Sequence, residues 1–534
     1  MEEFDAVVIG AGFAGLYQLY RLRQLGFATR GFEAGGSVGG TWYWNRYPGA
    51  RCDVESMDYS YSFSEELEQE WEWSERYPAQ PEILRYLDHV ADRFDLRPLI
   101  RFDTRVTSAV YDDRTHRWTV ATDHGDTVSA RFVIAATGCL SAWQVPEFEG
   151  LESFRGATYH TGNWPKEGVD FTGLRVGVIG TGSSGIQAIP RIAEQAAALH
   201  VFQRTPNYSV PARNHPLTPE YQRSRKATYR EYRARAKYSG GGHSAIPPTQ
   251  SALEVGDEER WSEYERRWRI GGAPLMQMVY KDIMTSEEAN RTIAEFVRAK
   301  IREIVRDPAV AEKLTPVDHP FGAKRLCVDI GYFETYNRDN VHLVDVRHSP
   351  IETITPRGVV TGGREYELDA IVFATGYDAM TGPLLNLGIR GRGGRRLDEV
   401  WSEGPRAYLG IQVAGFPNLF TVTGPGSPSV LSNMVVSIEQ HVDWVSDCLS
   451  YMREHGIETI EPDGEAQDAW VEHVNTAAEA TLHPRAKSWY LGDNIPGKPR
   501  VFMPYVGGVG AYREKCDEVV LRGYEGFVLT GGDH

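Results

Sequence analysis

The chain has 534 residues, 41% hydrophobic and 24% charged, a composition typical of a globular protein of roughly three or four domains. Its formal net charge of −16 disfavours a polyanionic partner, so we expect no nucleic-acid binding. No apolar run is long enough to span a membrane, and five cysteines without a CxxC spacing predict neither a disulfide framework nor a metal site. Because MEEFD leads almost directly into an apolar strand, we expect no signal peptide and a cytoplasmic protein.

The first predicted unit is a strand, a glycine-rich turn and a helix near the N-terminus. FDAVVIGAGFAG runs from an apolar strand into Gly10, Gly12 and Gly15, and LYQLYRLRQLG continues with helical apolar spacing. These glycines permit a tight turn, the approach of a pyrophosphate to the backbone, and close packing of helix on strand. Glu33 ends the next predicted strand, where a carboxylate can accept hydrogen bonds from ribose hydroxyls. The pattern predicts a Rossmann-like dinucleotide-binding unit.

An aromatic-rich, glycine-punctuated loop follows as GGTWYWNRYPGARCD, from Gly39 to Asp53. Its position after the first mononucleotide-binding half would let it cover a bound flavin. Further on, the apolar strands RFVIAATG (131–138) and DAIVFATG (369–376) share the ending Ala-Thr-Gly. We interpret this repetition as the chain leaving the first domain near residue 138 and re-entering it near residue 376.

A second dinucleotide-binding unit is predicted between these two strands. LRVGVIGTGSSG carries Gly180, Gly182 and Gly185 between a strand and a helix, and the next strand ends in Arg204 and Thr205. An arginine at this position suits the extra phosphate of NADP, whereas the first unit has an acid there. Two such units imply that two dinucleotides bind at once.

The stretch FRGATYHTGNWP lies just ahead of the second unit and carries Phe154, Gly156, His160 and Trp164. Its residues could pack a loop, link the domains or take part in chemistry. After the second unit, residues 213–319 are rich in helix formers. We expect the Gly/Pro-rich segment SGGGHSAIPPTQ (239–250) to be a mobile loop, and the basic cluster from 223 to 237 to be a solvated helix face.

The predicted fold class is α/β, with two Rossmann-like domains, the NADP domain inserted in the FAD domain and itself carrying a helical insertion. The predicted segments are 1–140 and 376–534 for the FAD-binding domain, 141–212 and 320–375 for the NADP-binding domain, and 213–319 for the helical insertion.

Three kinds of enzyme would use FAD together with NADPH: a disulfide reductase, an electron-transfer reductase and a flavin monooxygenase. The first needs a paired redox dithiol, and no cysteine pair is spaced for it. The aromatic loop from Gly39 to Asp53, and the cations Lys324 and Arg325 close to the chain's return to the first domain, favour the third.

The sequence resembles the type I Baeyer–Villiger monooxygenases over essentially its whole length. The family signature FxGxxxHxxxW(P/D) matches at 154–165, and the pattern GGxWxxxxYPGxxxD matches at 39–53. The stretches YPGARCDVES, HTGNWP, PGSPSVLSNM and SWYLGDNIPGK are closest to the phenylacetone and steroid monooxygenase branch. One departure is Asp493, where the family has a small apolar residue in a loop over NADP.

The resemblance implies a ketone substrate, O2, and the cofactors FAD and NADP, with conversion of ketones to esters or lactones through a flavin C4a-peroxide. Arg325 matches the active-site arginine, and Asp53 matches the aspartate that orients it. His160 then belongs to an interdomain linker that performs no chemistry itself. Further implied cofactor contacts are Thr41, Trp42, Tyr43, Trp44, Arg51, Tyr59, Val106, Thr181, Ser183, Ser184, Gln187, Arg204, Thr205, Lys324, Met434 and Trp489.

Two other functions remain open at this stage. One is a flavin-dependent N- or S-monooxygenase, and sulfide oxidation is a side activity to expect here too. The other, more remote, is a non-oxygenating NADPH flavoprotein reductase or a redox-sensing flavoprotein. We expect bulky aryl, cyclic or steroid-like ketones as substrates; the sequence does not name the physiological ketone or the oligomeric state.

Overall fold

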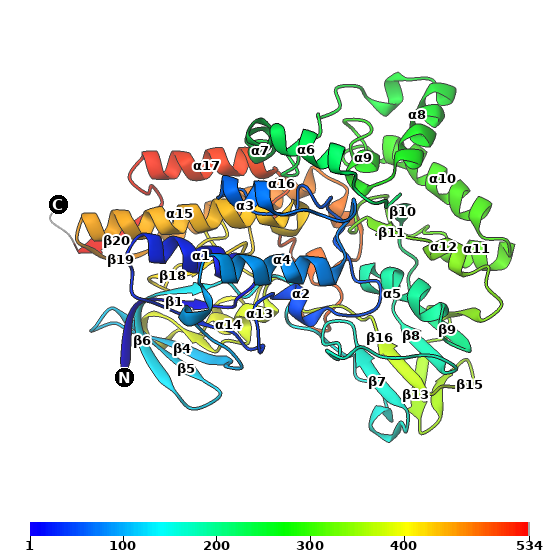
Figure 1. Ribbon diagram of the computed structural model, residues 1–534, viewed down its shortest axis with the longest axis horizontal. Coiled ribbons are helices and arrows are strands. Elements are labelled where there is room, and N and C mark those ends of the chain that lie inside the picture. The colour runs from blue at the N-terminus through cyan, green and yellow to red at the C-terminus, as the bar shows by residue number, and fades with distance from the viewer. Residues whose placement is uncertain (532–534) are drawn as a thin grey trace.

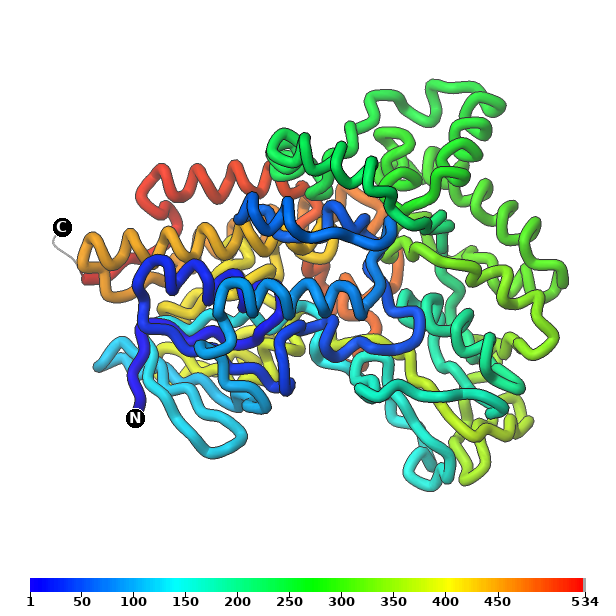
Figure 2. The backbone as a smooth tube through the Cα atoms, in the orientation of Figure 1, coloured from blue at the N-terminus to red at the C-terminus, as the bar shows by residue number. Residues whose placement is uncertain are grey.

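The computed structural model describes residues 1–531, so the last three residues of the predicted segment 376–534 lie outside the described residues. Two lobes lie side by side, and helices cover the upper side of the second lobe (Figure 1). The smooth backbone path shows that the blue N-terminal part and the orange and red C-terminal parts build the same lobe (Figure 2). The middle of the chain builds the other.

An eight-stranded sheet forms the centre of the first lobe. Strands β1, β2, β3, β6 and β18 run parallel, whereas β4 and β5 form an antiparallel meander that ends on β6. The strand order is β17 (Ile389–Arg390), β4 (Val106–Asp112), β5 (Arg117–Thr122), β6 (Thr127–Ala135), β1 (Glu2–Ile9), β2 (Thr29–Phe32) and β3 (Ile100–Arg101), with β18 (Leu419–Thr421) paired to β6.

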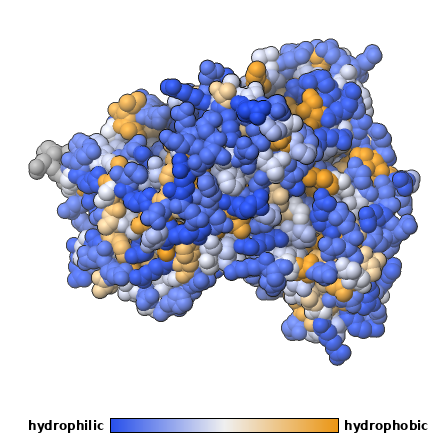
Figure 3. Space-filling view, viewed as in Figure 1, coloured by the Kyte–Doolittle hydropathy of each residue, from blue (hydrophilic) through white to orange (hydrophobic). Residues whose placement is uncertain are grey.

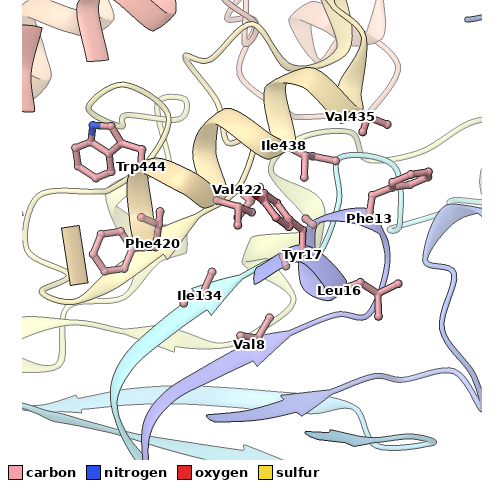
Figure 4. Packing of buried hydrophobic residues seen from close by; sticks show 14 of the residues in the cluster. Val8, Phe13, Leu16, Tyr17, Ile134, Phe420, Val422, Val435, Ile438 and Trp444 are labelled. Atoms are coloured by element: carbon pink, nitrogen blue, oxygen red, sulfur yellow. The ribbon is translucent and has the colours of Figure 1, made fainter. Parts of the chain in front are cut away.

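Helices from both ends of the chain cover one face of this sheet. Helix α1 (Phe13–Gln24) packs against α15 (Met434–Glu454), where the Tyr17 hydroxyl donates to Asp443 at 2.6 Å. Apolar residues of β1, α1, β6, β18 and α15 meet in a common core, including Val8, Leu16, Ile134, Phe420 and Ile438 (Figure 4). This core therefore joins early and late segments of the chain in one lobe.

The second lobe is built on a five-stranded sheet in which every strand is parallel, the arrangement that needs helical crossovers. Its order is β12 (Val341–Asp345), β9 (Ala198–Gln203), β8 (Arg175–Ile179), β16 (Ala370–Phe373) and β7 (Ala157–His160). Helix α5 (Ser183–Ala193) follows β8 directly. The predicted α/β fold class with two Rossmann-like units is confirmed.

The repeated Ala-Thr-Gly endings occupy equivalent places in the two lobes. Gly10 and Gly180 have φ angles of +106° and +112°, which favour glycine. A Cβ atom on Gly10 would lie 2.5 Å from the carbonyl oxygen of Ala136, and one on Gly180 would lie 2.4 Å from that of Ala374. Strand β6 belongs to the first sheet, and β7 and β16 to the second. The residue bounds of the domains stay a prediction.

Helices dominate between residues 213 and 319. Those within residues 257–314 lie above and beside the second lobe, whereas those within residues 219–237 lie at the top of the first lobe (Figure 1). They are α6 (Pro219–Ala227), α7 (Tyr229–Lys237), α8 (Asp257–Ile270), α9 (Ala273–Gln277), α10 (Glu287–Ile304) and α11 (Pro308–Leu314). The remaining helices and strands are α2 (Thr41–Trp44), α3 (Glu65–Glu70), α4 (Gln80–Arg93), α12 (Tyr332–Thr335), α13 (Gly382–Leu385), α14 (Leu397–Val400), α16 (Gly464–Glu479), α17 (Val509–Leu521), β10 (Ser209–Pro211), β11 (Cys327–Asp329), β13 (Ile351–Thr355), β14 (Gly358–Thr361), β15 (Arg364–Glu367), β19 (Ile457–Pro462) and β20 (Phe527–Gly531).

The expectation that the basic cluster 223–237 is a solvated helix face is wrong at Arg233. This side chain is buried, pairs with Glu68 at 3.0 Å, and donates to the Asp58 carbonyl at 3.0 Å and the Ser60 hydroxyl at 2.6 Å. The charge is tolerated because each guanidinium direction has an acceptor. It therefore ties α7 to the first lobe.

The segment 239–250 is a loop, as the sequence predicts, and its mobility stays a prediction. It forms no helix or strand, but its first residues are held by backbone hydrogen bonds. The amides of Asn433 and Val509 donate to the carbonyls of Gly241 and Gly240 at 2.9 and 3.0 Å. The local amino-acid composition does not predict long-range hydrogen bonds of this kind. Among residues 1–531, no helix combines the length and hydropathy that crossing a membrane would require.

Candidate active site

A cavity of about 1450 Å³ extends between the two glycine-rich turns and takes its walls from both lobes. The space-filling view shows a notch at the lower edge of the molecule where the two lobes meet (Figure 3). The cavity is lined by the turns after β1 and β8, by the loop 39–54, by residues 318–325 and by residues 485–494. It is therefore large enough, and suitably placed, for two dinucleotides with their reactive ends together.

The first end of the cavity presents a buried acid beside a helix N-terminus. The two carboxylate oxygens of Glu33 accept the amides of Ala11 and Gly35 at 2.8 and 2.7 Å. Burial raises the pKa of Glu33, and the two amide hydrogen bonds oppose that shift. Gly12 leaves the turn open to the cavity. These residues fit an adenine dinucleotide such as FAD, because they offer a ribose acceptor and free space at the N-terminus of α1.

Aromatic residues of the loop 39–53 line the same end. The Trp42 indole donates to the Tyr59 hydroxyl at 3.1 Å, and both rings line the cavity. Tyr43 does not line it: its hydroxyl accepts the Gly36 amide at 2.8 Å, and its ring packs over Gly35. Of the four residues of the short helix α2, Thr41, Trp42 and Trp44 line the cavity and Tyr43 does not.

The cavity wall between the two turns carries an arginine held by two other segments of the chain. Arg325 donates from Nε and Nη2 to the two oxygens of Asp53 at 2.7 and 2.8 Å, a bidentate pair. Its Nη1 donates to the Val430 carbonyl at 2.6 Å. Burial opposes the guanidinium charge, but Asp53 raises the pKa of Arg325 well above its ordinary value. The result is a permanent, oriented cation that keeps 29% of its side chain exposed to the cavity.

The second end combines a helix N-terminus with a basic recess. A Cβ atom on Gly182 would meet nothing within 4 Å, so the turn before α5 is open to a ligand. Arg204, Lys324 and Arg347 all line this end of the cavity. Burial lowers the pKa of Lys324, the Asp318 carboxylate opposes the shift, and the charges of Arg204 and Arg347 add to it. A phosphate-bearing nucleotide fits this recess.

A loop from the C-terminal part of the chain, around Trp489, lines the cavity. Ser488 Oγ and Asn494 Oδ1 are buried and lack a hydrogen-bond partner among the described residues, although both residues line the cavity. Such orphaned atoms fit a loop that folds over a polar ligand. Asp493, the departure from the family, turns back on its own loop. Its carboxylate accepts the Ser488 amide at 3.1 Å and pairs with Arg500 at 3.2 Å.

The stretch 154–165 contains the edge strand β7 of the second sheet and continues toward the first lobe, and of its residues Gly162 lines the cavity. His160 Nδ1 accepts the Gly162 amide at 2.9 Å, which leaves Nε2–H to donate to the Gln144 carbonyl at 3.2 Å. Burial lowers the pKa of His160 to about 4, so the ring is neutral at ordinary pH. The Trp164 amide donates to the Trp44 carbonyl of the first lobe at 3.2 Å. The stretch thus connects the two lobes.

A second contact between the lobes involves Gln187 of α5. Its side-chain oxygen accepts the Tyr47 hydroxyl at 2.7 Å, and its amide donates to the Arg51 carbonyl at 3.0 Å. Gly49 is required here, because a Cβ atom on it would lie 2.3 Å from the Gln187 carbonyl. The loop that ends in Asp53 is therefore braced by the helix of the second unit.

Most predicted site residues are brought together. All line the cavity except Gly15, Gly185 and Tyr43. Gly15 and Gly185 instead let helix and strand approach each other. A Cβ atom on Gly15 would lie 1.8 Å from the Gly10 carbonyl oxygen, and one on Gly185 would lie 2.3 Å from the Gly180 carbonyl oxygen. Sequence reasoning missed Asp318 and Arg347, which belong to no motif. Arg204 was identified as a charged residue just after a strand of the second unit. The same criterion would have identified Arg347.

The five cysteines are all free and buried, at positions 52, 139, 327, 448 and 516. Burial raises the pKa of Cys327 to about 12, so it is a poor nucleophile. No disulfide joins any two cysteines among the described residues.

Comparison with known proteins places the chain first in a broad class and then in a family. A family model described as "Pyridine nucleotide-disulphide oxidoreductase" matches residues 7–290. A Baeyer–Villiger monooxygenase of Pseudooceanicola batsensis is 45% identical over 98% of this chain and 96% of its own length. The chain belongs to the Baeyer–Villiger monooxygenases and is an oxidoreductase, as the two motifs predict.

Solved structures agree with this assignment. An oxidized steroid monooxygenase bound to NADP is 58% identical, with a TM-score of 0.95, and the match covers 99% of this chain and 100% of that chain. A complex of OTEMO with FAD and NADP is 43% identical, with a TM-score of 0.96, and the match covers 99% of each chain. A phenazine N-monooxygenase of Lysobacter antibioticus is also similar, with 42% identity over 98% of this chain and 97% of its own length.

Proposed function

We propose that this chain binds FAD and NADPH in the two ends of the cavity and uses O2 to convert ketones into esters or lactones. Glu33 and the turn at Gly10–Gly12 would hold FAD, and the turn at Gly180–Ser184 with the basic recess would hold NADPH. When both are bound, they supply hydride transfer and the activation of O2. The likeness to OTEMO, whose structure contains FAD and NADP, and to a steroid monooxygenase bound to NADP supports this pairing.

Arg325 carries the proposal for the oxygenating step. Insertion of oxygen into a ketone passes through a tetrahedral adduct whose former carbonyl oxygen becomes negative. An oriented guanidinium that cannot lose its proton stabilises that charge without reorganisation. Its bidentate pair with Asp53 and its bond to Val430 fix the direction of the remaining N–H groups. Asp53 is thus a positioning residue, and Arg325 the catalytic residue.

His160 has no part in proton transfer in this proposal. Both ring nitrogens are already used in hydrogen bonds between backbone segments, and the residue does not line the cavity. Its lowered pKa means that near neutral pH the ring lacks the second proton that a general acid would transfer. Its role is to hold the joint between the lobes, together with Trp164.

The substrate range that we propose is bulky aryl, cyclic or steroid-like ketones, with sulfides as a side activity. The 58% identity to a steroid monooxygenase favours the bulky end of this range. The similarity to a phenazine N-monooxygenase keeps N-oxidation as the competing function, because the same two cofactors would serve it.

The test is a substrate panel for the FAD-loaded protein with NADPH and air. It should contain a steroid ketone, an aryl ketone, a cyclic ketone, a thioether and phenazine, with products identified by mass spectrometry. We expect ester or lactone from at least one ketone, in proportion to NADPH consumed. Phenazine N-oxide as the coupled product, without ester from any ketone, would select the competing function.

A further inference from the structure

A chain of aromatic rings leads from the end of the cavity that we assign to FAD into the core of the first lobe. Trp42 and Tyr59 line the cavity, and the centroids of their rings lie 5.9 Å apart. The Phe13 ring lies 5.1 Å from the Tyr59 ring and 5.1 Å from the Tyr61 ring. The Tyr61 ring lies 6.0 Å from the Tyr17 ring. These separations are those of packed aromatic pairs, about 4.5–7 Å, so the rings form a continuous path.

The path ends where a buried phenol meets a carboxylate at the surface. Phe13 and Tyr17 both project from helix α1 into the core (Figure 4). The Tyr17 hydroxyl donates to Asp443 at 2.6 Å, and 43% of the Asp443 side chain is exposed. Burial and the Asp443 charge raise the pKa of Tyr17, so the phenol keeps its proton unless it is oxidised. A proton that Tyr17 then releases has an acceptor that contacts water.

The other phenols of the path have weaker proton acceptors. The Tyr61 hydroxyl donates to the Phe13 carbonyl at 2.6 Å, and the Tyr59 hydroxyl accepts an indole N–H at 3.1 Å. A backbone carbonyl is a far weaker base than a carboxylate. Because an oxidised phenol is a strong acid, the missing electron, or hole, is most stable where the phenol proton can leave. That position is Tyr17.

A side branch of rings lacks such an end. From Tyr61 it passes to Tyr86 at 6.1 Å and then to Trp71 at 5.2 Å. The Trp71 Nε1 atom is buried and has no hydrogen-bond partner among residues 1–531. An indole that cannot pass on its proton holds the hole less well than the Tyr17 phenol. We therefore expect a hole on this branch to return to the main path.

Resting on the proposed binding of FAD, we propose that the rings from Tyr59 to Tyr17 form an electron-transfer path that removes one-electron oxidants from the cavity. An oxygen-centred radical RO•, formed by homolysis of a peroxide in the cavity, takes an electron from Tyr59 and a proton from water, and becomes ROH. Tyr61 then returns an electron to Tyr59, and Tyr17 returns one to Tyr61. The Tyr17 proton passes to Asp443.

A soluble thiolate restores the surface end of the path. It gives one electron to Tyr17, and Asp443 returns the proton to the phenol. Two of the resulting thiyl radicals join as a disulfide. Tyr20 stacks on Tyr17 at 6.3 Å and is partly exposed, so the electron enters through its ring. The tyrosines are unchanged at the end, and the thiol has reduced the oxidant.

The sulfur side chains of the cavity are what such a path protects. Cys52, Cys139 and Met434 all line the cavity. Thiols and thioethers are oxidised readily, to sulfenic acid and to sulfoxide. A radical that the path reduces first does not reach them.

The test is transient absorption of the FAD-loaded full chain after a blue laser pulse, in buffer free of O2. Light makes the bound flavin a one-electron oxidant, so the pulse starts electron transfer at a known time. The variants are Tyr61→Phe, Tyr17→Phe and Asp443→Asn, which keep the side-chain shapes. Tyr111→Phe is the matched control, because Tyr111 is a buried tyrosine of the same lobe that does not line the cavity and whose hydroxyl lacks a partner among the described residues. Flavin content and melting temperature show that each variant is folded.

We expect a long-lived tyrosyl radical in the parent and in Tyr111→Phe, which deuterated tyrosine identifies by electron paramagnetic resonance and which glutathione removes. Tyr61→Phe and Tyr17→Phe should lose it, and flavin absorbance should recover sooner because the hole stays beside the flavin. Asp443→Asn should shorten its lifetime. An equally long-lived tyrosyl radical in Tyr17→Phe, or a radical that rests on tryptophan in the parent, would overturn the path. Protein that cannot be loaded with FAD would overturn the proposed function together with the path that rests on it.

A second measurement tests the protective role. After NADPH turnover in air without ketone, mass spectrometry should find more oxidised Cys139 and Met434 in Tyr17→Phe than in the parent and in Tyr111→Phe. Hydrogen peroxide formed per NADPH should be the same in all three proteins, so that the exposure to oxidant is matched. Equal oxidation of these side chains at equal peroxide would contradict protection by the path.

Discussion

Arg325→Ala separates the two halves of the proposed reaction. Hydride transfer takes place between the two cofactors, which have other anchors at Glu33 and at the turn before α5. Oxygen insertion needs the cation, and removing one preorganised donor of this kind costs ~10²–10³ in rate, or about 2.7–4 kcal/mol. We therefore expect NADPH oxidation to survive, though more slowly, with hydrogen peroxide as the product in place of ester.

The structure also defines the control for this experiment. Arg325 holds Asp53 by two hydrogen bonds and the Val430 carbonyl by a third, so its removal leaves a half-buried carboxylate without its partner. That loss costs about 1–3 kcal/mol of stability, less than for a fully buried pair. Asp53→Asn with Arg325→Ala relieves the unpaired charge while still removing the cation. Both proteins should retain flavin.

The assay is stopped-flow flavin reduction, together with peroxide and ester yields per NADPH. Arg325→Lys should rescue poorly, because an ammonium cannot hold both oxygens of Asp53 and also face the substrate. Ester formation by Arg325→Ala, coupled to NADPH use as in the parent, would refute the role of Arg325 in oxygen insertion.

Three further predictions follow from the site. Gly12→Val should give colourless or poorly folded protein, because the valine side chain would block the pyrophosphate. It would also press on Gly40, whose Cα lies 3.3 Å from a Cβ atom built on Gly12. Normal flavin absorbance would contradict this prediction. Arg204→Ala should raise the KM for NADPH by about 10-fold, which is the low end for a charge-assisted contact because Arg204 is exposed. Steady-state kinetics with NADH should be nearly unchanged. Equal weakening of both coenzymes would show that Arg204 has a structural role and does not select the phosphate. His160→Ala should slow turnover without abolishing ester formation. The pH profile between about pH 6 and 9 should not change, because the His160 pKa of about 4 keeps the ring neutral there. Disappearance of a titration step in that range in the variant would assign His160 a chemical role.

The same His160 links stability to pH. Burial places its folded-state pKa near 4, below the ordinary value of 6.5. The unfolded chain therefore takes up a proton first, and stability should be fully present above about pH 6.5 and fall as the pH drops from there toward 4. Melting temperatures of the parent and of His160→Gln across this interval measure the contribution.

Motifs whose chemistry depends on backbone geometry could be predicted from the sequence. The turns at Gly10 and Gly180 follow from glycine spacing, and Arg204 follows from its place after a strand. The two strands that end in Ala-Thr-Gly predict that one unit interrupts the other. In the structure the first ending packs against Gly10 and the second against Gly180. The bidentate Arg325–Asp53 pair came only from family resemblance, since its partners lie far apart in the chain.

Features that depend on long-range packing could not be predicted. Arg233 reads as one of several surface charges, yet its acceptors come from residues 58–68 of the other lobe. The glycines at 240 and 241 read as flexible, yet backbone donors from the C-terminal half hold them. Arg347 needs knowledge that β12 lies beside β9, which strand order decides.

The central claim is that one atom of O2 enters a ketone. Its most direct measurement is the reaction of the FAD-loaded protein with NADPH, ¹⁸O2 and a ketone that the panel identifies as a substrate, followed by mass spectrometry of the ester. The proposed function predicts one ¹⁸O atom per ester, placed in the ring or chain oxygen, with the carbonyl oxygen unlabelled. Consumption of NADPH that yields only labelled hydrogen peroxide, or label only on nitrogen or sulfur, would contradict it.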